Sequence, residues 1–226
     1  MRQETSPKYY NLLDALPEVG CPICRLILRE QDRYLDSLLY EYVNKVPTHQ
    51  AFRRARGLCN PHMDLLQAVP GNALGIAILM RATLDEVISI DEDTGPVTGA
   101  LGRLFNRNNT LSHADLLEPD GPCVLCEQMN AVEASYFEVL DRHREDERLH
   151  TGLRGSPGGL CLPHICIALR RLPDSDWLLD IQREHWRRLF NQLNTFTEKY
   201  NLSLQIESFG DEGDSWRRGI RYLAGE

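Results

Sequence analysis

Two sets of cysteine and histidine residues recur in this chain at one fixed offset. The first set is Cys21-x2-Cys24 followed, after 34 residues, by Cys59-x2-His62. Adding 102 to each position gives the second set: Cys123, Cys126, Cys161 and His164. Three cysteines and one histidine are a common ligand set for tetrahedral zinc. The repetition therefore predicts a tandem duplication in which each copy supplies one Cys3His metal site.

The spacing leaves two ways to pair these four motifs. We expect each copy to close on itself, so that one ion is held by Cys21, Cys24, Cys59 and His62 and the other by the second set. A helix over residues 22–43 would carry the chain about 33 Å, and residues 44–58 can just return across that distance. The alternative is exchange, in which the Cys-x2-Cys motif of one copy meets the Cys-x2-His motif of the other. We favour closure within a copy, because a duplicated unit once had to fold alone.

Zinc suits this ligand set, and four protein ligands per ion indicate closed, structural sites. An iron–sulfur cluster with Cys3His ligation is the alternative, because ligand type alone does not decide the metal. A redox Cys-x2-Cys pair is less consistent with the sequence, since no strand pattern of a βαβ unit surrounds these motifs. We predict no catalytic residues, because the sequence holds no catalytic triad, metalloprotease motif or phosphate loop.

The apolar residues recur at helical spacing through almost the whole sequence. Both long helices should begin inside their Cys-x2-Cys motifs, and both Cys-x2-His motifs should open short helices at their prolines. We expect an open loop at the glycine-rich residues 152–159, and a linker between the copies within residues 106–119. The predicted helices cover residues 22–44, 48–56, 60–69, 73–89, 162–171 and 176–200, with one more that begins at Cys123 and a last one capped by Asp214 and Ser215.

The remaining polar residues suggest no second site. Cys166 has Asp64 as its counterpart in the first copy and should be a small core residue. The basic run Arg53–Arg56 could bind an anion or the acidic face of a partner, although a solvated helix face explains it better. We interpret residues 142–148 as a solvated helix end that holds His143, with His150 beside it. We interpret His49, His113 and His185 as surface or packing residues.

The composition is that of an ordinary globular protein, with 226 residues, 42% hydrophobic and 26% charged. A formal net charge of −8 argues against a broad surface for nucleic acid or anionic membranes. The longest apolar run, residues 73–80, is too short to cross a bilayer, and no secretory signal is readable at the N-terminus. We therefore expect a cytoplasmic protein whose cysteines stay reduced and bind metal.

Several stretches also resemble an uncharacterised bacterial family that is catalogued as a domain of unknown function. They are the Cys21-Pro-Ile-Cys24 opening, the helix that contains residues 34–41, and the Gly57-Leu58-Cys59-x2-His62 motif. The closing stretch, residues 212–218, is also similar to the C-terminal end of that family. The resemblance covers nearly the whole chain. It implies a bacterial cytoplasmic protein and implies no activity.

These observations predict an all-α protein with two pseudo-symmetric helical units, residues 1–106 and residues 107–226, each tied by a zinc site. The function that fits best is a non-enzymatic protein-interaction or regulatory module with structural metal sites. A thiol-based redox or metal sensor and an iron–sulfur electron carrier are the alternatives. We expect the partner to be another protein, with a homo-oligomer as one case, and neither a membrane nor nucleic acid.

Overall fold

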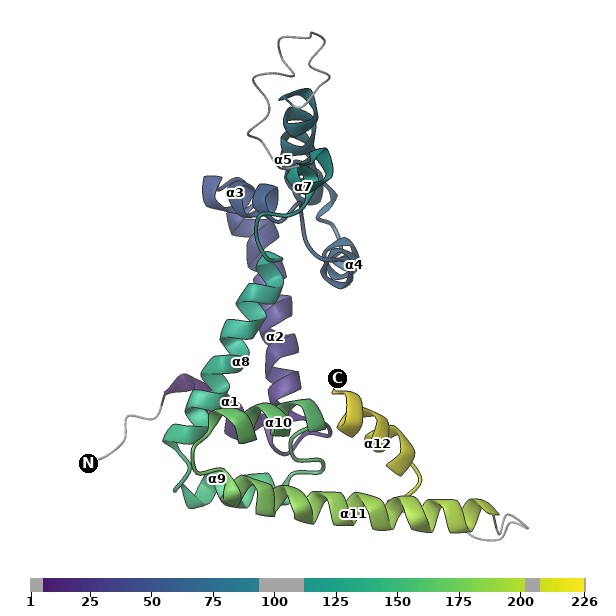
Figure 1. The fold of residues 1–226 in the computed structure, drawn as a ribbon. Coiled ribbons are helices and arrows are strands. Elements are labelled where there is room, and N and C mark those ends of the chain that lie inside the picture. Colours follow the sequence, from purple (N-terminus) through teal and green to yellow (C-terminus); the bar gives the residue numbers. More distant parts are fainter. Residues whose placement is uncertain (1–5, 94–111, 202–207, 226) are drawn as a thin grey trace. The chain divides into compact units, whose positions relative to one another are not determined.

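The computed structural model describes residues 6–93, 112–201 and 208–225 (Figure 1). Helices make up most of these residues, and no strand occurs among them. The prediction of an all-α protein is thereby confirmed. Alternating apolar and polar residues predict a short extended segment at residues 202–209, of which residues 202–207 lie outside the described residues. Part of the predicted linker at residues 106–119 lies outside them as well.

The helices follow the sequence prediction closely in order and length. Both long helices begin one residue after the first cysteine of a motif, and the last helix begins after Asp214. The elements are α1 (Pro7–Ala15), α2 (Pro22–Ser37), the π-helix η1 (Leu38–Tyr42), α3 (Val46–Arg54), α4 (Asn60–Ala68), α5 (Ala73–Asp93), α7 (His113–Leu117), α8 (Val124–Arg142), α9 (Glu147–Gly155), α10 (Leu162–Arg171), α11 (Asp176–Asn201) and α12 (Ser215–Ala224).

The chain forms two compact units that differ from the predicted sequence halves. Unit 1 consists of Met1–Arg29 together with Ala131–Glu226, and unit 2 consists of Glu30–Asn130. The boundary therefore falls inside α2 and inside α8. Each unit takes residues from both halves of the sequence, so the expected division at residue 106 does not describe how the chain packs.

Helices of the two sequence halves correspond in order, but not at one constant offset. The start of α4, Asn60, plus 102 gives Leu162, the start of α10. The start of α3, Val46, plus only 101 gives Glu147, the start of α9. A π-helix turn holds one residue more than an α-helical turn, so η1 accounts for the shift. The offset of 102 that relates the ligand motifs therefore does not hold for α3 and α9, which lie between them.

The predicted open loop at residues 152–159 is helical over its first half, residues 152–155. Helix α9 ends at Gly155, and the carboxylate of Asp146 caps its first turn by accepting a hydrogen bond from the Arg148 backbone N–H at 2.9 Å. Leu149 and Leu153, both on this helix, are fully buried. The cap and this burial outweigh the poor helix propensity of glycine.

Two other local predictions also needed correction. Helix α3 begins before Thr48, with Lys45 at the N-cap and a proline in the first turn. The predicted linker contains the short helix α7, where Ser112 and Asp115 form a reciprocal capping box. Proline fits the first helical turn because its missing N–H has no intrahelical partner there.

Unit 1 has its own hydrophobic core. The first half of α2 packs there with the second half of α8, α1, α9, α10 and α11. Its largest fully buried side chains include Tyr9, Phe137 and Tyr136. Tyr9 donates a hydrogen bond to Asp146 at 2.5 Å and stacks on the ring of His143, which is 2% exposed. His143 is therefore a core residue and not part of a solvated helix end.

Unit 2 packs α3 against α5, with Phe52, Leu66 and Leu79 fully buried. The arginines after Phe52 hold elements of this unit together. Arg53 donates to the Ala82 carbonyl at 3.2 Å and pairs with Asp85 at 3.3 Å, and Arg56 donates to the Leu116 carbonyl at 3.0 Å. Arg53 and Arg56 thus link elements within unit 2, whereas Arg54 between them is exposed. Neither earlier interpretation anticipated these contacts.

Candidate metal centres

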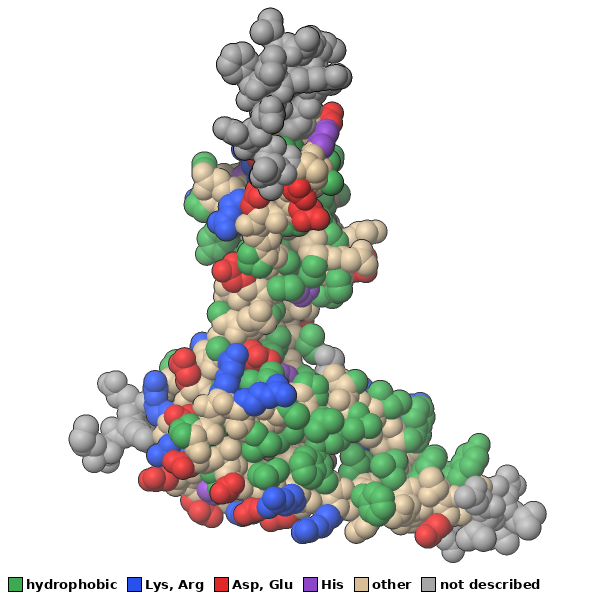
Figure 2. All heavy atoms as spheres, in the orientation of Figure 1, with side chains coloured by type: hydrophobic (Ala, Val, Ile, Leu, Met, Phe, Trp, Pro, Cys, Tyr) green, Lys and Arg blue, Asp and Glu red, His purple; other side chains and the backbone are tan. Residues whose placement is uncertain are grey.

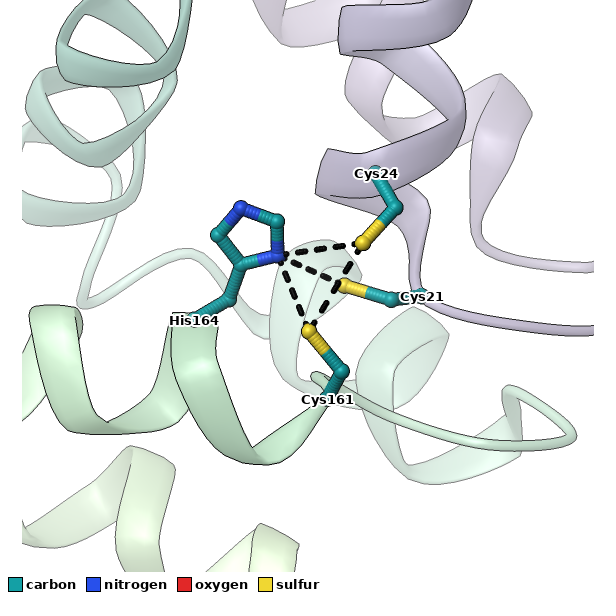
Figure 3. Close-up of side chains that lie close together, drawn as sticks. All are labelled: Cys21, Cys24, Cys161 and His164. Carbon is teal, nitrogen blue, oxygen red and sulfur yellow. Dashed lines mark hydrogen bonds between the residues drawn. The ribbon is translucent and has the colours of Figure 1, made fainter. Parts of the chain in front are cut away.

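Site 1 lies within unit 1 and consists of Cys21, Cys24, Cys161 and His164 (Figure 3). The His164 Nδ1 atom lies 3.3 Å from the sulfurs of Cys21 and Cys24 and 3.1 Å from that of Cys161. The Cys24 and Cys161 sulfurs are 3.6 Å apart. All four residues are buried, between 2% and 7% exposed. Two donor atoms from the start of α2 and two from the start of α10 thus surround one point.

Site 2 lies within unit 2 and consists of Cys59, His62, Cys123 and Cys126. The His62 Nδ1 atom lies 3.3 Å from the sulfurs of Cys59 and Cys123 and 3.4 Å from that of Cys126. The Cys59 and Cys126 sulfurs are 3.6 Å apart. These four residues are partly exposed, unlike those of site 1.

All eight predicted ligands fall into these two clusters, but the favoured pairing within each copy was wrong. The Cys-x2-Cys motif of the first half meets the Cys-x2-His motif of the second, and the reverse holds at the other site. The exchanged pairing is the alternative that the spacing left open. It follows from the packing of unit 1, where the start of α2 shares a core with α10.

Each motif places a cysteine at the start of a helix. Cys59 and Cys161 occupy the N-cap positions of α4 and α10, each with a proline in the first turn. The Arg25 N–H donates to the Cys21 carbonyl and the Glu127 N–H to the Cys123 carbonyl, which marks the same position in α2 and α8. A helix N-terminus favours thiolate over thiol through its dipole and free N–H groups.

A glycine precedes each Cys-x2-His motif by two residues, and both glycines adopt positive φ angles. The φ angle is +99° at Gly57 and +64° at Gly159. A Cβ at Gly159 would lie 2.7 Å from the ring of His185 and 2.8 Å from the Gln182 side chain. The left-handed turn directs the chain into the motif, which explains why this glycine occurs in both halves.

The pKa values of the ligands reflect crowded sulfurs. Burial raises the pKa of Cys21, and hydrogen bonds with the neighbouring thiols raise it further. In site 2, burial opposes hydrogen bonds from the Cys59 and Cys126 backbone and from His62, yet these bonds lower the pKa of Cys123 to about 6. Burial and the negative charge of its neighbours raise the pKa of Cys126 to about 12. The negative charge of the Cys123 thiolate thus favours the protonated form of Cys126.

His164 has a partner on its second ring nitrogen. Its Nε2 atom lies 3.1 Å from the Glu133 carboxylate, on α8 of the same unit. Burial alone would lower the pKa of His164, but hydrogen bonds with Cys161 and Cys24 raise it to about 10. A carboxylate on the far nitrogen fixes the tautomer in which Nδ1 can bind a metal. No motif or spacing in the sequence points to Glu133, apart from its place on a predicted helix.

The other candidate residues join neither cluster. Cys166 is only partly buried, which differs from the small core residue that we predicted. His185 is 4% exposed and bonds the Leu153 carbonyl at 2.8 Å, which makes it a packing residue. His49 and His150 each bond a carbonyl six residues earlier, at 2.7 Å and 2.6 Å. Adding 101 to position 49 gives position 150, so the same contact recurs in the two sequence halves.

Residues 11–226 match the model of a family of unknown function, DUF6062. The chain belongs to this family. It is 22% identical over 224 residues to the uncharacterized 23.9 kDa protein in the xynA 3′ region of Caldicellulosiruptor sp. (strain Rt8B.4), over 95% of this chain and 99% of that protein. No solved structure matches. The predicted membership of an uncharacterised family is confirmed.

No helix in the described part of the chain is both long enough and apolar enough to span a membrane.

Proposed function

We propose that this protein is a zinc-binding helical module in which two structural ions join helices that are distant in sequence. The observation that carries the proposal is the convergence of four soft donors at each site, all within 4.8 Å of one another. The donors come from helices in opposite halves of the chain. An ion at each site would therefore hold the two halves together within one unit.

The spacing of the donors supports a single ion over a cluster. Zn–S bonds of about 2.3 Å and Zn–N bonds of about 2.0 Å place tetrahedral sulfurs about 3.8 Å apart and sulfur and nitrogen about 3.5 Å apart. The observed separations are 3.6 Å between sulfurs and 3.1–3.4 Å between sulfur and nitrogen. An iron–sulfur cluster spreads its ligands over several irons and would need wider spacing.

The same module is best understood as the product of an internal duplication. The ligands repeat at an offset of 102, and the helices between them repeat in order at 101 or 102. Allowing the one-residue shift at η1 also aligns His49 with His150 and Arg53 with Arg154. Exchange of half-sites between two copies then resembles domain swapping within one chain.

Metal analysis of the native protein tests this proposal. We expect two zinc ions per chain, and the Co2+-substituted protein should show the visible absorption of tetrahedral thiolate coordination. Removing the metal with a strong chelator should lower the helical CD signal and the Tm, because ligand binding and folding are linked. Unchanged CD and Tm after complete metal removal would refute the structural role, and stoichiometric iron with sulfide would favour the cluster.

We further propose that the module binds another protein through unit 1. Figure 2 shows hydrophobic side chains gathered over α11 and α12. Phe190, Ile220 and Leu223 are between 59% and 62% exposed, and they adjoin an apolar groove of about 470 Å3 between the two helices. Exposed apolar patches of this kind mark interaction sites. A second copy of the chain is one such partner.

Site-specific photocrosslinking tests this interaction in the cell that produces the protein. A benzoylphenylalanine at position 190 should capture one defined polypeptide, and sedimentation of the purified protein shows whether that polypeptide is a second copy. The same probe at Tyr40, a residue of unit 2 that is 89% exposed, is the control. Equal capture from both positions would refute a specific binding face.

Two parts of the proposal follow from the ligand chemistry. Four protein ligands leave no position for a bound water, so we propose no catalytic role for either ion. Thiolates must stay reduced to bind metal, so we also propose a cytoplasmic location.

A further inference from the structure

The two sites share a ligand set but differ in their surroundings. The site 1 ligands are buried, whereas all four site 2 ligands are partly exposed. Three independent features of the described residues add to this difference. They are a cover on the sulfurs, the free space beside them, and the partner of the metal-binding histidine.

The C-terminal helix of unit 1 covers site 1. A Cβ placed on Gly225, just after α12, would lie 3.5 Å from the Cys24 sulfur and 3.8 Å from the Cys161 sulfur. Tyr222 of the same helix receives a hydrogen bond from the Trp186 indole of α11, which anchors the cover. In the described part of unit 2 the helix that follows α5 is the five-residue α7, whose Leu116 carbonyl accepts from Arg56, and the four ligands of site 2 remain partly exposed.

The free space beside the site 1 sulfurs is too small for a competing ligand. The cavity along Cys21, Cys161 and Tyr222 has a volume of about 20 Å3. A single water molecule needs about 10–15 Å3 on this measure. A chelator with several donor groups does not fit in this cavity, so its approach to the Cys21 and Cys161 sulfurs along it requires movement of α12.

The histidines of the two sites also differ in support. Glu133 contacts the far nitrogen of His164 in site 1. Subtracting 102 from 133 gives Gln31, so the corresponding position on α2 carries a neutral amide. A carboxylate partner raises the basicity of a metal-bound histidine, and losing such a partner typically weakens metal binding about 10–100-fold.

From these differences we infer that site 2 is the exchangeable metal site, at which the protein gives up and takes up a divalent ion, while site 1 keeps its ion. The inference rests on the proposed function, since both sites must bind metal. Site 2 would then respond to competing soft ligands in solution, and the fold of unit 1 would persist during the exchange. The protein would be a metal-responsive switch with one fixed and one mobile ion.

Chelator competition on the full-length, zinc-loaded protein tests the inference. Excess EDTA should release half of the zinc at least tenfold faster than the other half. Pulsed alkylation with N-ethylmaleimide and mass spectrometry needs no substitution to assign the phases. Cys59, Cys123 and Cys126 should become reactive with the fast phase, and Cys21, Cys24 and Cys161 with the slow phase. Cys166, which joins neither site, should react from the start and calibrates the alkylation.

A substitution on α8 provides the second readout. Glu133→Gln should accelerate the slow phase about tenfold or more, whereas Glu138→Gln, an exposed residue of the same helix, should leave both phases unchanged. Release of both ions in one phase, or earlier reaction of the site 1 cysteines, would overturn the inference. The proposed function, with two structural zinc ions, would still stand. A native protein without stoichiometric metal would instead overturn the proposed function itself.

Discussion

Replacing Gly159 by alanine tests how the chain enters the Cys161 motif. The φ angle of +64° costs a residue with a Cβ about 1–2 kcal/mol. The added methyl would also lie 2.7 Å from the His185 ring and 2.8 Å from the Gln182 amide, both buried. Overpacking of this kind costs about 1–3 kcal/mol. We therefore expect Gly159→Ala to lower the free energy of unfolding of unit 1 by about 2–5 kcal/mol.

The tryptophans make unit 1 separately observable. Trp177, Trp186 and Trp216 all belong to it, so urea unfolding followed by tryptophan fluorescence reports this unit alone. Gly155→Ala, at the end of α9, is the matched control, because no atom lies within 4 Å of its Cβ position and its φ angle is not positive. It should be neutral or stabilising by up to about 1 kcal/mol. If Gly159→Ala shifts stability by less than about 0.5 kcal/mol, the reasoning about the turn is wrong.

Three further predictions concern single side chains. Asp146→Ala removes the cap of α9 and should destabilise unit 1 by about 1 kcal/mol in fluorescence-detected urea unfolding. Hydrogen bonds from Arg148 and Tyr9 hold the pKa of Asp146 well below its usual value, so its contribution is present above a pH of about 3.9 and is lost below it. The stability difference between wild type and Asp146→Ala should accordingly shrink in acid, and a constant difference would contradict the assignment. Phe52→Ala should destabilise unit 2 by about 3–5 kcal/mol in CD-detected unfolding while the tryptophan transition stays in place, and a matching shift of both transitions would argue against separate units. Cys166→Ser should leave two zinc ions per chain, and loss of one ion would place Cys166 in a metal site.

Local patterns were sufficient to predict most of the helices and the residues of both candidate sites. Cys-x2-Cys and Cys-x2-His each define half of a metal site within one turn, so they can be read without tertiary structure. The prolines in the first turns of α4 and α10, and the prolines and turn residues that follow these helices, likewise predicted their ends nearly to the residue. These features depend on neighbours within a few positions, which the sequence shows directly.

The pairing of the half-sites could not be predicted in this way. Both closed and exchanged pairings satisfy the same local geometry, and the choice depends on how α2, α8 and α10 share the core of unit 1. The helix at Gly152 was missed for a similar reason. A Cβ at Gly152 would lie 2.6 Å from Leu16, so this glycine permits close packing of a helix on the α1 region and does not mark a loop.

The exchanged pairing also sets the order in which the two candidate sites are completed during synthesis on the ribosome. Cys24 waits for Cys161, 137 residues later, whereas Cys59 needs only Cys126, 67 residues later. At about 5–20 residues per second, the first thiol pair stays without its partners for roughly 7–27 s of synthesis. The ligands of site 2 all lie in sequence between Cys24 and Cys161, so site 2 is completed first. An early ion bound by Cys21 and Cys24 alone would have to survive, or be exchanged, until the C-terminal half emerges.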